Sequence, residues 1–342
     1  MLIAFSSSAD PDTLWRVLIA LVHHVGHFAA KTSQFRDLIS SIFHFNWNTE
    51  WKVIIALVNL IHHMVSANTL LLIPALQLLV RSFLATNKGN QSAEQESLPV
   101  FNTFLDRPND LFGLLHRSIR CLLSMCPSGQ SELFPILEAN FPFIKDSSIE
   151  HSLYVSHLLI ICQYLPMQQS KLLELIVTKC IEIDVEIHIE ESGEVKIRKP
   201  ADFEDPNLLF EDHDYNAFAT SGNLNEVSEM ADKLDNMMVL LVQFIDGKLA
   251  EDSSNGVVRD RLFMQLLRIF EDHILMVHRS KFVQFLLFYI ASRDHKFAQA
   301  FSKLLMSIFL DVRNPFLKRQ SAVVYLGSYF ARATFLPPQY IR

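Results

Sequence analysis

The clearest candidate for chemistry in this sequence is a histidine cluster near its start, His23-His24-Val25-Gly26-His27. On a continuous helix, His23 and His27 would lie four residues apart on one face, a spacing that can hold a metal ion. No acidic residue follows the first histidine, so the HExxH arrangement of a zinc protease is absent. Surface or partly buried histidines are the favoured interpretation. A metal-dependent enzyme that uses His23 and His27 is kept only as an alternative.

Other residues that could do chemistry lack the required spacing. The acidic residues between Asp202 and Asp214 do not have the alternating ligands and central glycine of a calcium loop, so a solvated acidic linker is favoured. The sequence contains no GxxxxGK[ST], GxGxxG or GxSxG motif, and its four cysteines form no CxxC pair. We therefore predict no catalytic, cofactor-binding or metal-binding residues, no cofactor, and no enzyme activity.

Composition favours a helical protein. Half of the 342 residues are hydrophobic, yet only nine are glycine, and both nucleotide-binding α/β enzymes and all-β folds use glycine freely in turns. The most apolar stretch is interrupted by Asn59, His62, His63, Asn68 and Pro74, so no membrane span is predicted.

Charge is distributed unevenly along the chain. The whole sequence carries a formal charge of −7, which disfavours a protein that coats DNA. Residues 182–232 hold 15 acidic and three basic residues, a net charge of −12, so the remainder is +5. An acidic segment is thus set into a mildly basic body.

Helical periodicity runs along almost the whole chain and organises it into pairs. The connections are mostly short, and the pairs restart about every 35–40 residues once two insertions are removed, which is close to the period of a HEAT repeat. The fold class predicted is all-α, an α-solenoid of HEAT-type helix pairs. The helices expected are 12–28, 33–44, 49–66, 69–84, 108–126, 131–140, 147–164, 167–183, 228–247, 256–273, 279–291, 295–309 and 313–334.

Two insertions separate the helices. Residues 86–107 are polar, whereas residues 185–227 are acidic and open with the alternating stretch VEIHIEESGEVKIR. A turn at 191–193 would pair Ile189 with Val195 and Ile187 with Ile197, giving a small charged β-hairpin at 185–199. We therefore divide the chain into an N-terminal HEAT-repeat half (1–184), the acidic insertion (185–227) and further HEAT repeats (228–342).

The last helical segment, RQSAVVYLGSYFARATFL at 319–336, has two features of interest. Its apolar residues follow the stripe of a buried solenoid helix, and Gly327 would allow a neighbouring helix to approach closely. Arg319 and Arg332 lie near its two ends, where they can reach solvent and bind an acidic partner. With Gln320, they are the candidate partner-binding residues. The stripe consists of Ala322, Leu326, Tyr329, Phe330 and Ala333.

Several segments, taken in order, resemble the family of RNA polymerase I-specific transcription initiation factors, growth-regulated HEAT-repeat proteins. The last helical segment is the most specific part of this resemblance. The resembling residues are Trp47; Val65-Ser66-Ala67 with Thr69, Leu72 and Pro74; Pro135-Ile136-Leu137; Phe141-Pro142-Phe143; Leu173-Glu174-Leu175-Ile176; Leu234-Asp235; Gln284-Phe285; Phe288-Tyr289; Phe297-Ala298; Ala300-Phe301; Asn314-Pro315; Arg319-Gln320; Gly327-Ser328; Ala331-Arg332-Ala333; and Phe335.

The resemblance implies a nuclear and nucleolar protein that acts by protein contact. It implies docking beside the stalk of RNA polymerase I, largely through the N-terminal half, and contact with the promoter-bound selectivity factor. It also implies control by serine phosphorylation, for which Ser147 and Ser148 are candidates and Ser6, Ser7 and Ser8 weaker ones. Ser147 and Ser148 can equally be helix caps. Direct sequence-specific DNA binding and membrane association are not expected, and a homodimer is left open.

The sequence departs from the family in one respect. Family members continue for several helix pairs beyond the last segment, so we expect this chain to correspond to the N-terminal portion of the family, truncated relative to it. A generic helical-repeat adaptor or transport factor unrelated to transcription is the alternative function.

Overall fold

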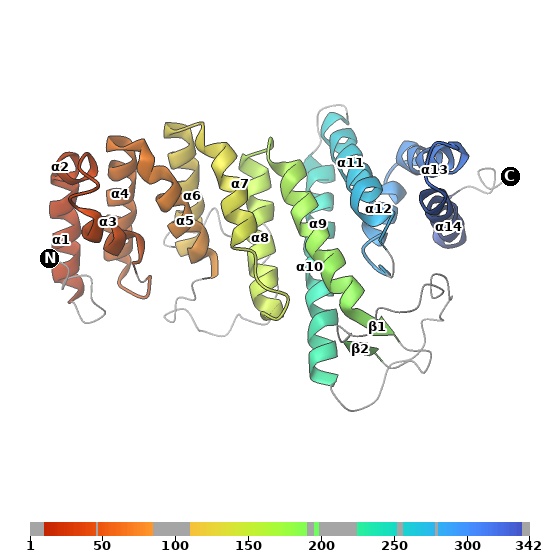
Figure 1. The fold of residues 1–342 in the computed structure, drawn as a ribbon, viewed down its shortest axis with the longest axis horizontal. Coiled ribbons are helices and arrows are strands. Elements are labelled where there is room, and N and C mark those ends of the chain that lie inside the picture. Colours follow the sequence, from red (N-terminus) through yellow and green to blue (C-terminus); the bar gives the residue numbers. More distant parts are fainter. Residues whose placement is uncertain are drawn as a thin grey trace. The chain divides into compact units, whose positions relative to one another are not determined.

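The computed structural model describes residues 10–45, 47–84, 110–189, 195–197, 224–251, 256–277 and 280–336. Several sequence predictions lie outside these residues: Ser6, Ser7 and Ser8, the polar insertion 86–107, the hairpin turn 191–193, and the acidic linker up to residue 223. Most of the described residues are helical (Figure 1).

The helices follow the predicted order, but there are fourteen among the described residues where thirteen were predicted, and their ends differ. They are α1 (Pro11–His23), α2 (Val25–Ala29), α3 (Arg36–Phe43), α4 (Trp51–Ala67), α5 (Leu72–Arg81), α6 (Leu111–Met125), α7 (Gly129–Ala139), α8 (Ser148–Tyr164), α9 (Gln169–Glu186), α10 (Leu224–Glu251), α11 (Val257–Ile269), α12 (Phe285–Ser292), α13 (His295–Leu310) and α14 (Phe316–Arg332). Short 3₁₀ turns η2 (Thr69–Leu71) and η3 (Ser82–Leu84) flank α5, and a π-helical turn η5 (Phe270–Ile274) follows α11.

Two predicted helices are wrong in their bounds, for physical reasons visible in the structure. The segment 12–28 is two helices, because the backbone dihedral angles of His24 (φ −110°, ψ 11°) are not helical. Gly26, two residues later, has a low helix propensity and favours this break. The segment 279–291 becomes helical only at Phe285, because the N–H groups of Lys281, Phe282 and Val283 are bonded to the Asp184 carboxylate instead.

The chain forms two compact units. Unit 1 comprises Met1–Pro142 with Ser156–Gln169, and unit 2 comprises Phe143–Val155 with Ser170–Arg342. These units follow packing, whereas the division at 184 and 228 follows composition, so that division stays a prediction.

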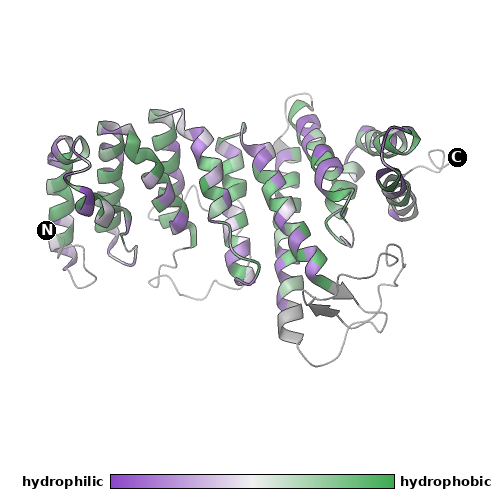
Figure 2. Ribbon diagram, in the orientation of Figure 1, coloured by the Kyte–Doolittle hydropathy of each residue, from purple (hydrophilic) through white to green (hydrophobic). Residues whose placement is uncertain are grey.

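Unit 1 is a stack of helix pairs in two layers. Helix α4 packs between α1 and α6 in one layer, and α5 packs between α3 and α7 in the other, while α4, α5, α6 and α7 also contact one another in sequence. Figure 2 shows that hydrophobic residues dominate α4 and α5, and nine residues of α4 alone are buried. This two-layer stacking, with apolar stripes facing the interior, is the arrangement of HEAT-type repeats.

Two histidines lie in the core of unit 1. His116 of α6 and His157 of α8 are fully buried, and His116 Nε2 shares a hydrogen bond of 3.0 Å with His157 Nδ1. His116 Nδ1 shares another, of 3.1 Å, with the Tyr164 hydroxyl, and the Phe83 ring stacks on His157 at 4.3 Å. Burial lowers the pKa of His116 well below its ordinary value and that of His157 to about 3. Both imidazoles are therefore neutral in the folded protein at neutral pH.

Unit 2 is organised around α10 and an aromatic cluster. Helix α10 contacts α11, α12 and both strands, and α13 packs on α12 and α14. Phe301 of α13 lies 5.1 Å from Phe270, 5.9 Å from Phe288 and 4.9 Å from Tyr329, measured between ring centroids. These rings bring η5, α12, α13 and α14 together by burying aromatic surface in edge-on and tilted contacts.

The predicted β-hairpin is confirmed in its register, but Val185 and Glu186, predicted as its first residues, are the last residues of α9. Strands β1 (Ile187–Ile189) and β2 (Val195–Ile197) pair antiparallel, with Ile187 opposite Ile197 and Ile189 opposite Val195. Because β1 follows α9 without a break, the hairpin extends directly from a helix end. The fold is therefore all-α, an α-solenoid of HEAT-type helix pairs with a small inserted hairpin. Among the described helices, none has the length and apolar composition needed to cross a membrane.

A buried carboxylate joins α9 to the start of α12 in unit 2. Asp184 is fully buried, and its Oδ2 accepts hydrogen bonds from Ser280 Oγ (2.7 Å) and from the backbone N–H groups of Lys281 (2.8 Å), Phe282 (3.0 Å) and Val283 (3.4 Å). Burial raises the pKa of the Asp184 carboxyl, and these four hydrogen bonds act in the opposite direction. Three successive N–H groups directed at one oxygen form an anion-binding nest that the chain itself occupies.

The Asp184→Ala variant is expected to lose about 3 kcal/mol of stability, because it leaves several buried donors without their acceptor. Thermal and urea unfolding measure this loss. The matched control is Asp235→Ala, which removes an exposed carboxylate from α10 and should unfold like the unmodified protein. Equal unfolding midpoints for both variants would contradict the role given to Asp184.

Stability is expected to fall as the pH is lowered from 7.5 to 5. The unfolded chain binds a proton on each histidine near pH 6.5, whereas His157 in the folded protein does so only near pH 3. The unfolded state therefore binds more protons in this interval, and His157 alone costs about 2 kcal/mol at pH 5. Urea unfolding at both pH values measures the effect. His157→Phe should make the pH dependence shallower; an unchanged dependence would refute the assignment.

Candidate partner-binding surface

Helix α14 is half core and half surface. Ala322, Leu326 and Tyr329 are buried, as is Ala333 just beyond the helix end, so the predicted apolar stripe is confirmed at these positions, while Phe330 is only partly buried. Tyr329 packs between the rings of Phe288 (5.0 Å) and Phe301 (4.9 Å). This packing fixes the rotation of α14 and thereby decides which residues face outward.

The outward side of α14 is made of small and apolar residues. Phe316, Val323, Val324, Gly327 and Ala331 are all exposed. Among the described residues, nothing lies within 4 Å of the position that a Cβ on Gly327 would take, so the close helix approach predicted at Gly327 does not occur in this part of the chain. An exposed strip of this kind is typical of a surface that binds another protein.

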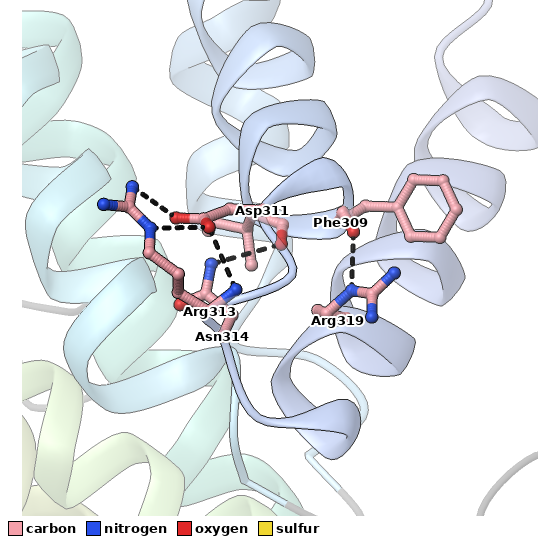
Figure 3. A network of polar contacts seen from close by, with 6 residues as sticks. Phe309, Asp311, Arg313, Asn314 and Arg319 are labelled. Carbon is pink, nitrogen blue, oxygen red and sulfur yellow. Dashed lines mark hydrogen bonds and ion pairs between the residues drawn. The ribbon is translucent and has the colours of Figure 1, made fainter.

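A polar network fixes the turn before α14 (Figure 3). Arg313 Nε donates to Asp311 Oδ1 at 2.9 Å, and the guanidinium lowers the pKa of this aspartate below its ordinary value. The Asn314 side-chain amide donates to the Ile308 carbonyl at 3.2 Å. On the other side of the turn, Arg319 Nε donates to the Phe309 carbonyl at 2.8 Å. These bonds satisfy carbonyls at the C-terminal end of α13, which its helix cannot satisfy itself.

The candidate residues of α14 lie at its two ends. Arg319 and Gln320 are neighbours in the first turns and are partly buried, whereas Arg332 is the last residue of the helix and is exposed. The two arginines are thirteen positions apart on the helix, about 20 Å at 1.5 Å per residue. Arg332 Nη1 donates to Ser328 Oγ at 2.8 Å, which holds its side chain along the helix. The arginines therefore border the apolar strip and do not form one charged cluster.

Ser147 caps α8 in a complete capping box. Its Oγ accepts from the Glu150 N–H at 3.2 Å, and its own N–H donates to Glu150 Oε2 at 3.0 Å. This reciprocal pair is the arrangement expected for Ser-x-x-Glu at a helix start. A phosphate on Ser147 would displace these bonds and place its charge beside Glu150.

The neighbouring segment is held by α10. The Ser148 hydroxyl accepts from the Asn236 side-chain amide at 3.0 Å, and the Lys233 Nζ donates to the Ile144 carbonyl at 2.6 Å. Lys233 is almost fully buried, and burial lowers the pKa of its amine. Helix α10 therefore holds the segment 144–148 at Ile144 and at Ser148, whereas the Ser147 side chain bonds to Glu150 of its own helix.

Comparisons with known proteins place this fold in a family. The family profile described as RNA polymerase I specific transcription initiation factor RRN3 matches residues 4–342. The chain belongs to this family. Two curated relatives carry the name RNA polymerase I-specific transcription initiation factor RRN3. The Mus musculus protein is 29% identical over 331 residues, covering 90% of this chain and 48% of its own length. The Schizosaccharomyces pombe protein is 28% identical over 274 residues, covering 72% of this chain and 45% of its own length.

A solved structure agrees with the family assignment. The crystal structure titled RNA polymerase I transcription initiation factor Rrn3 superposes with a TM-score of 0.73 at 20% identity, covering 99% of this chain and 61% of that chain. At this identity the superposition supports the fold. The chain spans about half the length of the curated RRN3 relatives that it matches.

The histidine cluster does not have the predicted geometry. Helix α1 ends at His23 and α2 begins at Val25, so His23 and His27 do not lie four residues apart on one helix, and both are exposed. No group of three or more potential metal ligands was found among the described residues. Membership of the RRN3 family, described as transcription initiation factors, gives the metal-enzyme alternative no support.

Three features of the structure were not found from the sequence. They are the Asp184 anchor, the buried Lys233, and the exposed apolar residues of the α13–α14 turn. Asp184 and its partner Ser280 are 96 residues apart, so no local pattern connects them. The sequence of the turn did contain a signal for exposed apolar residues, because four of them are too closely spaced to share one buried face. All four are exposed in the structure: Leu310, Val312, Phe316 and Leu317.

Proposed function

We propose that this chain acts in transcription initiation by RNA polymerase I, as a non-enzymatic protein that joins the polymerase to the promoter-bound selectivity factor. The match of the RRN3 family profile to residues 4–342 carries this proposal. The names of the mouse and fission yeast relatives also support a role in initiation by RNA polymerase I. The joining of polymerase to selectivity factor is proposed from the resemblance of the sequence segments alone. The proposed place of action is the nucleus, and within it the nucleolus.

The contacts are proposed to be of two kinds. The N-terminal HEAT-repeat half (1–184) docks on stalk-side subunits of the polymerase, and the strip on α14 bordered by Arg319, Gln320 and Arg332 binds an acidic surface of a partner. Apolar residues supply the buried area there, and the arginines supply orientation and charge complementarity. A homodimer remains a further arrangement to test, and the repeats from 228 onward are proposed as a separate module from the acidic insertion 185–227.

Regulation is proposed to act at the start of α8. A phosphate on Ser147 adds a charge of about −1.5 to −2 next to Glu150, and one on Ser148 meets the Asn236 amide that now binds its hydroxyl. Either change alters the surface at the α8 N-terminus without touching the aromatic core of unit 2.

The first test is retention of this chain by immobilised RNA polymerase I, with RNA polymerase II as the comparison. We expect retention by RNA polymerase I alone. If Arg319 and Arg332 face the polymerase, the double variant Arg319→Glu, Arg332→Glu should reduce retention about tenfold at low salt, because ion pairs are screened as salt rises.

The control is the double variant Arg261→Glu, Arg268→Glu, which makes the same charge change at exposed positions of α11. No retention by RNA polymerase I would refute the docking role. Retention that both double variants leave unchanged would exclude α14 as the polymerase contact, and the same assay with purified selectivity factor would then decide its partner.

The second test separates regulation from stability at Ser147. Ser147→Asp should reduce retention by RNA polymerase I several-fold while changing the melting temperature little, because aspartate is also a good helix cap. Ser147→Ala removes about 1 kcal/mol of capping energy but adds no charge, so it should bind normally. Equal retention of the two variants would contradict phosphoregulation at this site.

A further inference from the structure

The turns within successive helix pairs of unit 1 line up along one edge. The Asn68 side-chain amide, at the α4–α5 turn, donates to the Ala29 carbonyl of the preceding pair at 2.8 Å. The next contact is steric: a Cβ on Gly129, at the α6–α7 turn, would lie 2.5 Å from Leu72 Cδ2. The Gln168 amide, at the α8–α9 turn, then donates to the Gln130 carbonyl at 2.9 Å. Each turn thus touches the next, along the upper side of unit 1 in Figure 1.

Large apolar side chains project from these turns into solvent. Leu70 is 80% exposed and Ile73 42% exposed at the α4–α5 turn, Met125 is 40% exposed at the α6–α7 turn, and Met167 is 84% exposed at the α8–α9 turn. We call these four residues the turn edge. Turns normally place polar residues in water, so apolar side chains at three consecutive turns are not required by folding and indicate an interaction surface.

The turn edge lies in chain segments without charge. Residues 53–80, 121–131 and 151–170 contain no Asp, Glu, Lys or Arg, although these residues make up 20% of the whole chain. A charged group of a partner buried here would lose its hydration and gain no opposite charge, which is costly. Exposed Glu132 and Lys171, in the first turns of α7 and α9, flank these segments. The surface that fits the four turn-edge side chains themselves is therefore apolar. Methionine adds adaptability, because its flexible side chain adjusts to the shape of a partner.

The spacing of the turns fits a helical partner. Neighbouring packed helices lie about 8–10 Å apart, so consecutive turns repeat at about this distance along the edge. On an α-helix, residues seven positions apart lie on nearly the same face and are separated by about 10.5 Å along the axis. A helix lying along the turns can thus present one apolar side chain to each of them.

We propose that the turn edge binds an amphipathic helix of a partner protein, which lies across the α4–α5, α6–α7 and α8–α9 turns with uncharged apolar residues seven positions apart. This site is on unit 1 and differs from the α14 strip and from the serines of α8. It lies within residues 1–184, so it deepens the docking role proposed above for that half by naming the form of the bound segment. Its test uses a synthetic helix and no polymerase, so the two proposals can fail separately.

The test uses the full chain and a fluorescein-labelled synthetic helix, with binding followed by fluorescence anisotropy. The probe is about 21 residues long, so that it spans three turns at 1.5 Å per residue, and carries leucines seven residues apart with alanine and glutamine on the same face. We expect saturable binding that changes less than about twofold between roughly 50 and 500 mM salt, because no ion pairs contribute. The double variant Leu70→Gln, Met167→Gln should weaken binding about tenfold through lost apolar burial.

Matched controls separate the turn edge from general hydrophobic binding. Ile55→Gln changes an exposed apolar residue on the body of α4 and should leave binding unchanged. A second probe of the same composition, with leucines five residues apart, should bind at least about tenfold more weakly because its leucines do not share one face. All substituted side chains are solvent-exposed, and equal melting temperatures of the variants would show that folding is intact.

Three results would overturn the proposal. They are no saturable binding of the first probe, equal binding of both probes, or equal binding to the double variant and the unmodified chain. A fourth result would replace the helix with a second copy of this chain as the occupant. This holds if light scattering finds a dimer, the Leu70→Gln, Met167→Gln variant abolishes that dimer, and the probe does not compete with dimer formation.

Discussion

Unit 2 depends on the burial of one carboxylate. The chain leaves α9, enters the hairpin and the long acidic insertion, and returns through α10 and α11 before it reaches α12. Chain connectivity therefore does little to keep α9 beside α12. Asp184 does this instead, by accepting the hydroxyl of Ser280 and three successive N–H groups from residues 281–283. Water does not reach the buried carboxylate to replace these donors. Breaking the contact would therefore leave buried polar groups without hydrogen bonds, which costs free energy.

The Asp184 contact also determines where α12 begins. The N–H groups directed at the carboxylate satisfy donors ahead of the helix, and α12 follows at Phe285. The cluster of Phe270, Phe288, Phe301 and Tyr329 then fixes α12, α13 and α14 against one another. The orientation of α14, and with it the exposed strip between Arg319 and Arg332, follows from this sequence of contacts. A surface proposed for binding thus rests on a buried polar anchor and an aromatic core.

Unit 1 is held together by contacts that recur from one helix pair to the next. Each helix packs on its counterpart in the next pair, and contacts between consecutive turns hold the pairs in line. Repeat proteins of this kind present extended surfaces, because each pair adds a similar element at a regular interval. The buried His116–His157 pair shows that the core tolerates polar side chains when they bond to each other and stay neutral. Because both histidines resist protonation when buried, this arrangement is expected to make the folded state less stable at acidic pH.

The sequence by itself determined the features that repeat at short range. The 3.6-residue period gave the helices and the buried stripe of α14, the alternation in VEIHIEESGEVKIR gave the hairpin and its register, and Ser147 with Glu150 three residues later carries the signature of the observed cap. Only the tertiary structure decided that Asp184 meets Ser280, that Lys233 is buried against Ile144, and that Leu70 and Met167 lie on one edge. These residues come together from distant parts of the chain, and a pattern read within one helix or strand contains no information about which distant side chain will meet it.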